Sequence, residues 1–256
     1  MIIDCHGHCS HDGSYGLSAD EMVKSLDRYG VDKICCSRPM STRPAEATPK
    51  EVRLRNDTIL QSMKMHPERI MGFCYVNPGF AQNAQDEIAR CVADGGMAGV
   101  KMYHQYKMDD PVQYPVIERC IELGVPVLTH AGWPSAPETM ERQPNIATGA
   151  QYADVAPRYP EAMFICGHIG GGGDWERQLK GLRDAPNVFL DTSGSVCDAG
   201  MVERCLRELG ADRLLFGCDG SMERGLGKVA DARMRTSERR NIMGGNFLGI
   251  LARRKA

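Results

Sequence analysis

Short apolar segments alternate with longer amphipathic segments along almost the whole chain. The apolar segments are five to eight residues long and most are rich in β-branched or aromatic residues, which predicts strands. They span residues 1–8, 31–37, 70–76, 99–104, 126–130, 163–168, 188–193 and 213–219. Helical patterns lie between them, for example at 18–30, 85–96, 116–124 and 201–210. Several of these end at glycine, which is typical of a helix C-terminus, and SADE at 18–21 predicts a capping box.

The order of these elements predicts the fold. Eight strand-like and about eight helix-like units alternate strictly, which indicates right-handed crossovers and a parallel sheet. Eight such units in 256 residues fit a closed (β/α)₈ TIM barrel of the α/β class, and a doubly wound open sheet is the alternative. No linker-like stretch interrupts the alternation, so we expect residues 1–256 to form a single domain.

Composition narrows the function classes. The formal charge of −2 gives no bias toward nucleic acid or membrane, and no stretch approaches the roughly 18 apolar residues of a membrane span. The start MIIDCH lacks a basic leader. The eleven cysteines contain no C-x-x-C pair and sit mostly in apolar runs, as reduced core residues do. We therefore expect a cytoplasmic protein with a small-molecule substrate; a homo-oligomer is left open.

Polar residues gather at the carboxyl ends of the predicted strands. They are His6, His8, Arg38, Asn77, Lys101, His104, His130, His168, Asp191 and Asp219. In a (β/α)₈ barrel these ends meet at one mouth, which is the face that carries active sites. The pattern therefore predicts an active site at that mouth.

The first predicted strand, with the sequence MIIDCHGH, brings two imidazoles to one face. Residues two apart on a strand share a face, so Asp4, His6 and His8 are expected to point the same way. Taken alone, H-x-H favours a structural histidine. Histidines at the ends of two later strands and a carboxylate at the end of the last one favour a metal site instead. A nitrogen-rich set with one carboxylate suits zinc (Zn²⁺), with manganese (Mn²⁺), iron or cobalt as alternatives.

These stretches resemble the amidohydrolase superfamily, in its amidohydrolase-related branch. That branch holds small-molecule hydrolases, lactonases and non-oxidative decarboxylases (lyases). The matching stretches run in the expected order from residue 2 to 251: IIDCHGH, GVKMYH, PVLTHAG, FICGHIGGG, LLFGCDG and IMGGNFLGIL. The resemblance implies a barrel of the metallo-dependent hydrolase type with one divalent metal ion.

The resemblance also implies roles for individual residues. The metal ligands would be His6, His8, His130 and Asp219. His168 would then be either a further ligand or a nearby acid/base. Asp219 follows a strongly apolar strand, where a carboxylate is costly to bury without a cation. We expect Asp219 and His168 to be the catalytic residues, with Asp219 accepting the proton of the attacking water.

An anionic substrate is expected from the cations near the mouth. Arg38 and Lys101 lie at strand ends, and we expect Tyr103 and His104 to join them in binding the substrate. The alternative is an ordinary charged surface. Some superfamily members carry a carbamylated lysine at the position of Lys101, but a lysine that pairs with Asp219 or with a substrate anion is favoured.

Three loops complete the prediction. Residues 37–50 and 131–149 form long loops after predicted strands, where lids and specificity elements usually lie. The sequence GHIGGGGDWE at 167–176 predicts a turn that lets the chain approach the site closely, with a phosphate cradle as the alternative. Asp174 is expected to cap the next helix.

The function expected from these residues is a metal-dependent hydrolase that acts on a small, carboxylate-bearing substrate through a metal-activated water. A non-oxidative decarboxylase of the same branch is the first alternative. A catalytically silent barrel that binds a metal or a partner is the second.

Overall fold

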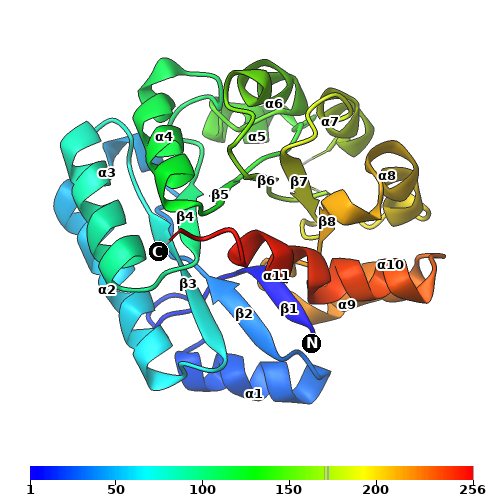
Figure 1. Ribbon diagram of the computed structural model, residues 1–256, viewed down its shortest axis with the longest axis horizontal. Coiled ribbons are helices and arrows are strands. Elements are labelled where there is room, and N and C mark those ends of the chain that lie inside the picture. Colours follow the sequence, from blue (N-terminus) through cyan, green and yellow to red (C-terminus); the bar gives the residue numbers. More distant parts are fainter. Residues whose placement is uncertain (170, 172, 256) are drawn as a thin grey trace.

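The computed structural model describes residues 1–169, 171 and 173–255. Its strands are β1 (Ile3–Gly7), β2 (Lys33–Cys36), β3 (Ile70–Tyr75), β4 (Gly99–Met102), β5 (Val127–Thr129), β6 (Phe164–Cys166), β7 (Val188–Asp191) and β8 (Leu214–Leu215). Its α-helices are α1 (Ala19–Tyr29), α2 (Pro49–Met65), α3 (Ala81–Ile88), α4 (Tyr114–Leu123), α5 (Pro137–Arg142), α6 (Gly149–Val155), α7 (Trp175–Leu182), α8 (Met201–Leu209), α9 (Met222–Asp231), α10 (Thr236–Arg240) and α11 (Asn246–Leu251). Figure 1 shows the strands at the centre and the helices around them.

The eight strands form one parallel sheet in sequence order, from β1 to β8. Two backbone hydrogen bonds then join β1 to the chain that follows β8. Cys5 N donates to Phe216 O at 2.9 Å, and Asp219 N donates to His6 O at 2.8 Å. The sheet is therefore a nearly closed barrel, and the prediction of a (β/α)₈ fold is confirmed over that of an open sheet.

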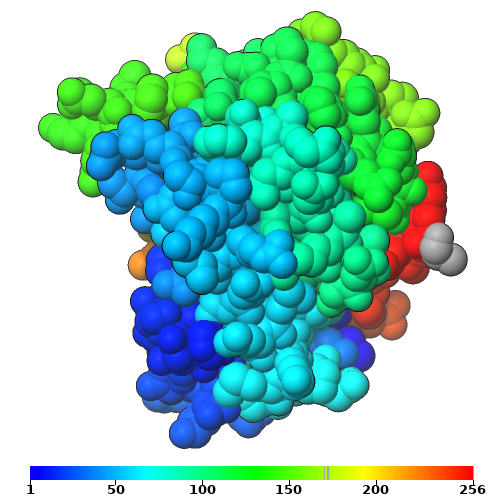
Figure 2. Space-filling model, turned by 90° about the vertical axis from the view of Figure 1, so that its left-hand side faces the viewer, coloured from blue at the N-terminus to red at the C-terminus, as the bar shows by residue number. Residues whose placement is uncertain are grey.

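Two apolar layers hold the barrel together. The inner layer contains alternate strand residues that face the barrel axis, among them Phe73, Leu128 and Ile165. Phe247 and Ile250 of α11 pack against this layer, and Figure 1 shows α11 lying across that end of the barrel. The outer layer lies between strands and helices. In Figure 2 the residues of α2 and α3, light blue to cyan, cover much of one face of the barrel.

A bulge in β1 changes the predicted alternation. The pairing of β1 with β2 shifts between Asp4 and Gly7, so β1 holds one residue more than its partner over this stretch. Cys5 packs in the inner layer, although simple alternation places it on the face opposite His6. The expectation that Asp4 shares a face with His6 and His8 is wrong for this reason.

The predicted local signals are mostly present. Ser18 and Glu21 form the capping box of α1, and Gly30 ends that helix with φ 67°. Asp174 caps α7 by accepting a hydrogen bond from Arg177 N. The last strand is shorter than the predicted segment 213–219, because Phe216 N donates to Ile242 O rather than to a neighbouring strand.

The cysteines are core residues, as predicted. All eleven are free thiols, and ten are buried; Cys197 is exposed. Within the part of the chain that the structure describes, the helices are too short or too polar to cross a bilayer. The cytoplasmic location stays a prediction.

Candidate metal centre and active site

His6 lies at the end of β1, fully buried, with one ring nitrogen already engaged. Its Nδ1 is 2.7 Å from Asp191 Oδ2 at the end of β7. The packing beside it is tight, since a Cβ on Gly167 or Gly217 would lie 3.2 Å from His6 atoms. Burial, with the nearby Lys101 charge, lowers the pKa of His6 to about 4. The imidazole is therefore neutral at neutral pH, and its bond to Asp191 leaves Nε2 with a free lone pair.

His8 has the same arrangement two residues later. Its Nδ1 is 2.8 Å from the carbonyl oxygen of Ser37, which can only accept, so Nδ1 carries the hydrogen. Its Nε2 therefore presents a lone pair to Asp219 Oδ1 at 2.9 Å, and Asp219 Oδ1 is 3.8 Å from His6 Nε2. Three acceptor atoms that face one another repel unless a cation or a proton lies between them. This arrangement fits a metal ion.

Two sets of His and Asp donors in the described part of the chain lie within 4.8 Å of one another. One set is His6, His8 and Asp219, and the other is His6, His168 and Asp191. In the second set, Asp191 already accepts a hydrogen bond from His6 Nδ1. The first set turns three acceptor atoms toward one place, within reach of a cation that binds each at about 2.0–2.2 Å.

Asp219 and His168 both have left-handed backbones, with φ of 48° and 71°. Such a conformation costs on the order of 1–3 kcal/mol for a non-glycine residue and is often found at functional sites. Backbone bonds hold both residues: Asp219 N donates to His6 O, and His168 N donates to Asp191 Oδ1 at 2.9 Å. Burial raises the pKa of Asp219, but the electrostatic effect of the neighbouring His168 and His8 imidazoles outweighs it and holds that pKa well below its ordinary value.

A hydroxyl group determines which nitrogen of His168 carries the hydrogen. Ser193 Oγ donates to Asp191 Oδ1 at 2.5 Å and is 2.8 Å from His168 Nδ1. Because the serine proton points to Asp191, its oxygen accepts from His168 Nδ1–H. His168 Nε2 then has the lone pair, and it lies 2.8 Å from Nδ1 of His130.

His130 follows β5 and contacts His168 rather than the three clustered donors. Its Nε2 is 3.1 Å from the side-chain amide of Gln143. Burial and the neighbouring His168 lower the pKa of His130 well below the ordinary value, so this ring is also neutral. Its assignment as a fourth ligand stays a prediction, since ligation would require its Nδ1 to leave His168.

Lys101 is fully buried at the end of β4, beneath the mouth. Its Nζ is 2.9 Å from His6 Nε2, so the structure places it against the imidazole rather than in an ion pair with Asp219. Burial lowers the pKa of Lys101 to about 8, although the charges of Asp219 and Asp191 act in the opposite direction. Lys101 and a metal ion would therefore compete for the same lone pair of His6 Nε2.

The other predicted substrate-binding residues fall into two places. The Tyr103 ring packs 4.4 Å from that of His130 and 4.6 Å from that of the buried His104, which makes an aromatic wall. Arg38 instead lies over the Tyr15 ring, 5.3 Å from its centroid. It lines a separate cavity of about 430 Å³ beside α2.

A cavity of about 280 Å³ opens beside His130, His168 and Asp219. The long loop 131–149 lines it, as predicted, and contributes Gln143. Of the predicted close-approach turn, Gly171 lies against the site, since a Cβ there would be 2.8 Å from His168 Cβ; Gly170 and Gly172 lie outside the described residues.

Three residues of the candidate site were not predicted from the sequence: Gln143, Ser193 and Arg224. Only Ser193 left a trace in the sequence, because it stands two residues after the strand-end Asp191. Arg224 lines the cavity from α9, where no strand end marks it.

The amidohydrolase family model matches residues 3–246. The chain belongs to the amidohydrolase family. It is 25% identical over 253 residues to the gamma-resorcylate decarboxylase of Polaromonas sp. (strain JS666), and the match covers 80% of this chain and 77% of that protein.

Solved structures show the same fold. The dihydroxybenzoic acid decarboxylase of Polaromonas, with bound manganese and 2-nitroresorcinol, superposes with a TM-score of 0.77 at 16% identity and covers 100% of this chain and 98% of that one. The 5-carboxyvanillate decarboxylase of Sphingomonas paucimobilis has a TM-score of 0.76 at 16% identity and 98% coverage of both chains.

These relatives change the expected reaction. They support an enzyme, but they are decarboxylases, so the first alternative is favoured over the expected hydrolase. The expectation of a divalent metal agrees with them, because one relative holds manganese and the described residues include a His/His/Asp set.

Proposed function

We propose that this protein is a divalent-metal-dependent, non-oxidative decarboxylase of a small hydroxylated aromatic acid, with manganese as a suitable metal. The observation that carries this proposal is the pair of neutral imidazoles, His130 and His168, 2.8 Å apart in the wall of the cavity beside Asp219. A decarboxylase must deliver one proton to carbon, and a coupled histidine pair is suited to hold and pass that proton.

Metal binding would use His6, His8 and Asp219, whose donor atoms converge. When bound there, the cation supplies positive charge that holds the substrate's oxygens and draws electron density from the ring. Lys101, buried against His6, adds positive charge beside these donors. The His130 ring lines the cavity and packs against the Tyr103 ring, which gives this wall an aromatic surface for an aromatic substrate.

The reaction balances with one proton from the protein. The His130–His168 pair first takes up a proton from water and then donates it to the ring carbon that bears the carboxylate, which leaves both imidazoles neutral. The bond from that carbon to the carboxylate then breaks. Its electron pair returns to the ring and CO₂ leaves. Ser193 holds His168 Nδ1, so proton exchange takes place at Nε2, on the side of His130. Water in the cavity then restores the proton to the pair.

The test is incubation of the manganese-loaded protein with 2,6-dihydroxybenzoate in D₂O. We expect CO₂ release, and a phenolic product with one deuterium at the carbon that lost the carboxylate. Chelation should abolish the activity and added manganese should restore it. A lactone assayed in parallel separates the hydrolase, which would open the ring of the lactone and release no CO₂. Lactone hydrolysis without CO₂ release from a panel of hydroxybenzoates would overturn the proposal.

A further inference from the structure

We propose that Arg224 binds a second carboxylate of the substrate, so that the site prefers an aromatic ring with two anionic groups. The inference rests on the proposed function, because it takes the group held at His6, His8 and Asp219 as the first carboxylate. It adds a specificity-determining residue that lies on a helix rather than at a strand end.

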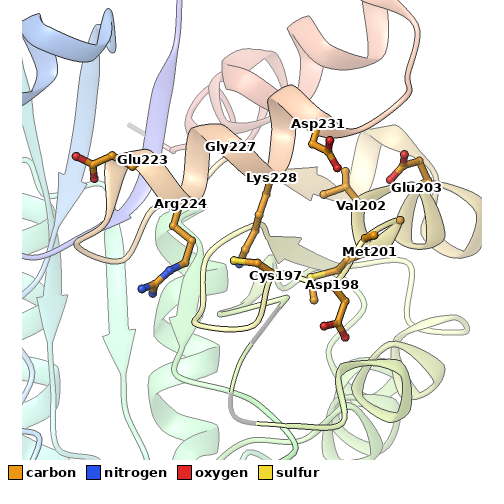
Figure 3. A pocket seen from close by; sticks show the side chains of 12 residues that line it. Cys197, Asp198, Met201, Val202, Glu203, Glu223, Arg224, Gly227, Lys228 and Asp231 are labelled. Carbon is orange, nitrogen blue, oxygen red and sulfur yellow. The ribbon is translucent and has the colours of Figure 1, made fainter.

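Arg224 is placed to meet a molecule in the cavity. It stands in the first turn of α9, five residues after Asp219, and it lines the 280 Å³ cavity together with His130, His168 and Asp219. Figure 3 shows Arg224 and Lys228 leaving the same side of α9, whereas Glu223 points away from them. Of the metal-binding residues, Asp219 lines the same cavity as Arg224.

Its charge is not used by the protein. Within the described residues, no carboxylate lies within 4.0 Å of the Arg224 guanidinium, whereas Arg183 and Arg204 nearby both pair with Glu208. The adjacent Glu223 is engaged elsewhere, as the acceptor of a hydrogen bond from Tyr29 Oη. All five N–H donors of Arg224 are therefore available to a ligand, and a carboxylate can accept two of them side by side.

The helix that carries Arg224 is fixed relative to the catalytic histidines. Lys228, one turn further along α9, donates to the carbonyl oxygens of Thr192, Ser193 and Gly194 at 3.2, 3.0 and 2.8 Å. The Ser193 side chain in turn contacts His168. This connection sets the position of the Arg224 backbone against His168, as binding of one particular molecule requires.

Two centres of positive charge would bind the substrate. One is a metal ion held by His6, His8 and Asp219, of which Asp219 lines the cavity, and the other is Arg224 on α9. Arg38 does not line this cavity; it lines a separate one beside α2. A ring with one carboxylate satisfies a single centre, whereas a ring with two carboxylates can satisfy both.

The experiment measures binding and turnover separately in the manganese-loaded enzyme. Calorimetry compares benzoate with the three benzenedicarboxylates in wild type, Arg224→Gln and Arg224→Lys. Arg207→Gln is the matched control, because Arg207 is an exposed arginine on α8 that does not line this cavity. CO₂ release is measured from 2,6-dihydroxybenzoate and from 4-hydroxyisophthalate, and circular dichroism checks the fold of each variant.

We expect wild type to bind one dicarboxylate isomer at least about 10-fold tighter than benzoate, as one charge-assisted pair implies. Arg224→Gln should remove that preference and raise KM for 4-hydroxyisophthalate by about 10- to 100-fold with little change in kcat. Arg224→Lys should recover part of the preference, and Arg207→Gln should retain all of it.

Equal affinity of wild type for benzoate and all three dicarboxylates would overturn the inference, and so would a preference that survives Arg224→Gln. Neither result would contradict the proposed decarboxylase function, provided that CO₂ is still released. An Arg224-dependent preference without CO₂ release from any acid would support the second anion site and refute the decarboxylase.

Discussion

Two buried carboxylates in this barrel are satisfied in opposite ways. Glu87 of α3 accepts from Arg90 at 2.7 and 3.0 Å and from Asn56 of α2 at 2.9 Å. Asp191 of β7 accepts from His6 Nδ1 and from a hydroxyl group and two backbone N–H groups. Burial raises the pKa of each, but partners outweigh it and both pKa values lie below the ordinary range.

Because their partners differ, Glu87 has a structural role and Asp191 has a functional one. A guanidinium stays charged at any physiological pH, so the Glu87 network is a permanent connection between α2 and α3. The partners of Asp191 are an imidazole and a hydroxyl group, whose protons can be placed or moved. Asp191 therefore controls which nitrogen of His6 is free and, through Ser193, which nitrogen of His168 is free. A buried carboxylate without an arginine or lysine partner marks the active end of this barrel.

The largest expected effect comes from replacing the proposed metal-binding residues His6 and Asp219. His6→Ala should lose bound manganese and all measurable turnover. Asp219→Asn should keep the metal and lose turnover by about 100-fold or more, because the carboxylate that faces His168 is gone. Metal content after gel filtration and kcat for CO₂ release measure both. A His6→Ala protein that retains manganese, or an Asp219→Asn enzyme with nearly wild-type kcat, would contradict this.

A third buried carboxylate, Asp4, makes the stability of the protein depend on pH. Asp4 Oδ1 accepts from His6 N and Cys218 N, but it has no cationic partner, and burial raises its pKa from 3.8 to about 7. The folded state then holds a proton that the unfolded state releases, so the free energy of unfolding falls as pH rises from about 4 to 7.

Asp4→Asn keeps the acceptor oxygen and removes this titration. Between pH 5 and pH 8 the metal-free wild type should lose about 2–3 kcal/mol relative to the variant, in urea unfolding. Parallel stability curves for the two proteins would show that Asp4 does not titrate in this range.

The structural role of Glu87 and the functional role of Asp191 are tested by replacing each carboxylate with an amide. Glu87→Gln should lower the free energy of unfolding by about 1–3 kcal/mol, because Arg90 loses its buried partner, while manganese affinity stays unchanged. Asp191→Asn should weaken manganese affinity by about 10- to 100-fold, because the orientation and tautomer of His6 are lost. Urea denaturation and metal titration on both variants give the four values needed. Weakened metal binding in Glu87→Gln would contradict the purely structural role of Glu87.

The smallest expected effect concerns the hydroxyl that links Asp191 to His168. Ser193→Ala removes one hydrogen bond to His168 Nδ1, which is worth about 1 kcal/mol, so kcat should fall roughly fivefold with KM unchanged. Ser193→Thr retains the hydroxyl and should restore most of the loss. An unchanged kcat in Ser193→Ala would mean that other contacts orient His168.

Much of this molecule could be predicted from local pattern. Each of the eight predicted strand segments contains a strand, because a buried parallel strand needs an apolar run and the connecting helices need amphipathic ones. The placement of His6, His8, His168 and Asp219 at one mouth followed from topology alone, since the carboxyl ends of parallel strands must meet when the sheet closes.

Other features depend on contacts between residues that are far apart in the chain. The bulge in β1 occurs where β1 bonds to the segment after β8, and no property of residues 3–7 reveals that partner. Lys101 contacts His6 across the barrel, and Arg38 turns toward Tyr15 instead of the cavity. Side-chain direction at a strand end is decided by packing, which local sequence does not encode.

Residue type and strand order were thus sufficient to assemble the donors of a metal site, because chain topology carries them to one place. The proton positions were not predictable. Which nitrogen of His6, His8 and His168 is free follows from Asp191, the Ser37 carbonyl and Ser193, each within 3 Å in the fold and 25 or more residues away in the chain. Hydrogen bonds of this length act only after folding has set the distances, so the chemistry of the site belongs to the tertiary structure.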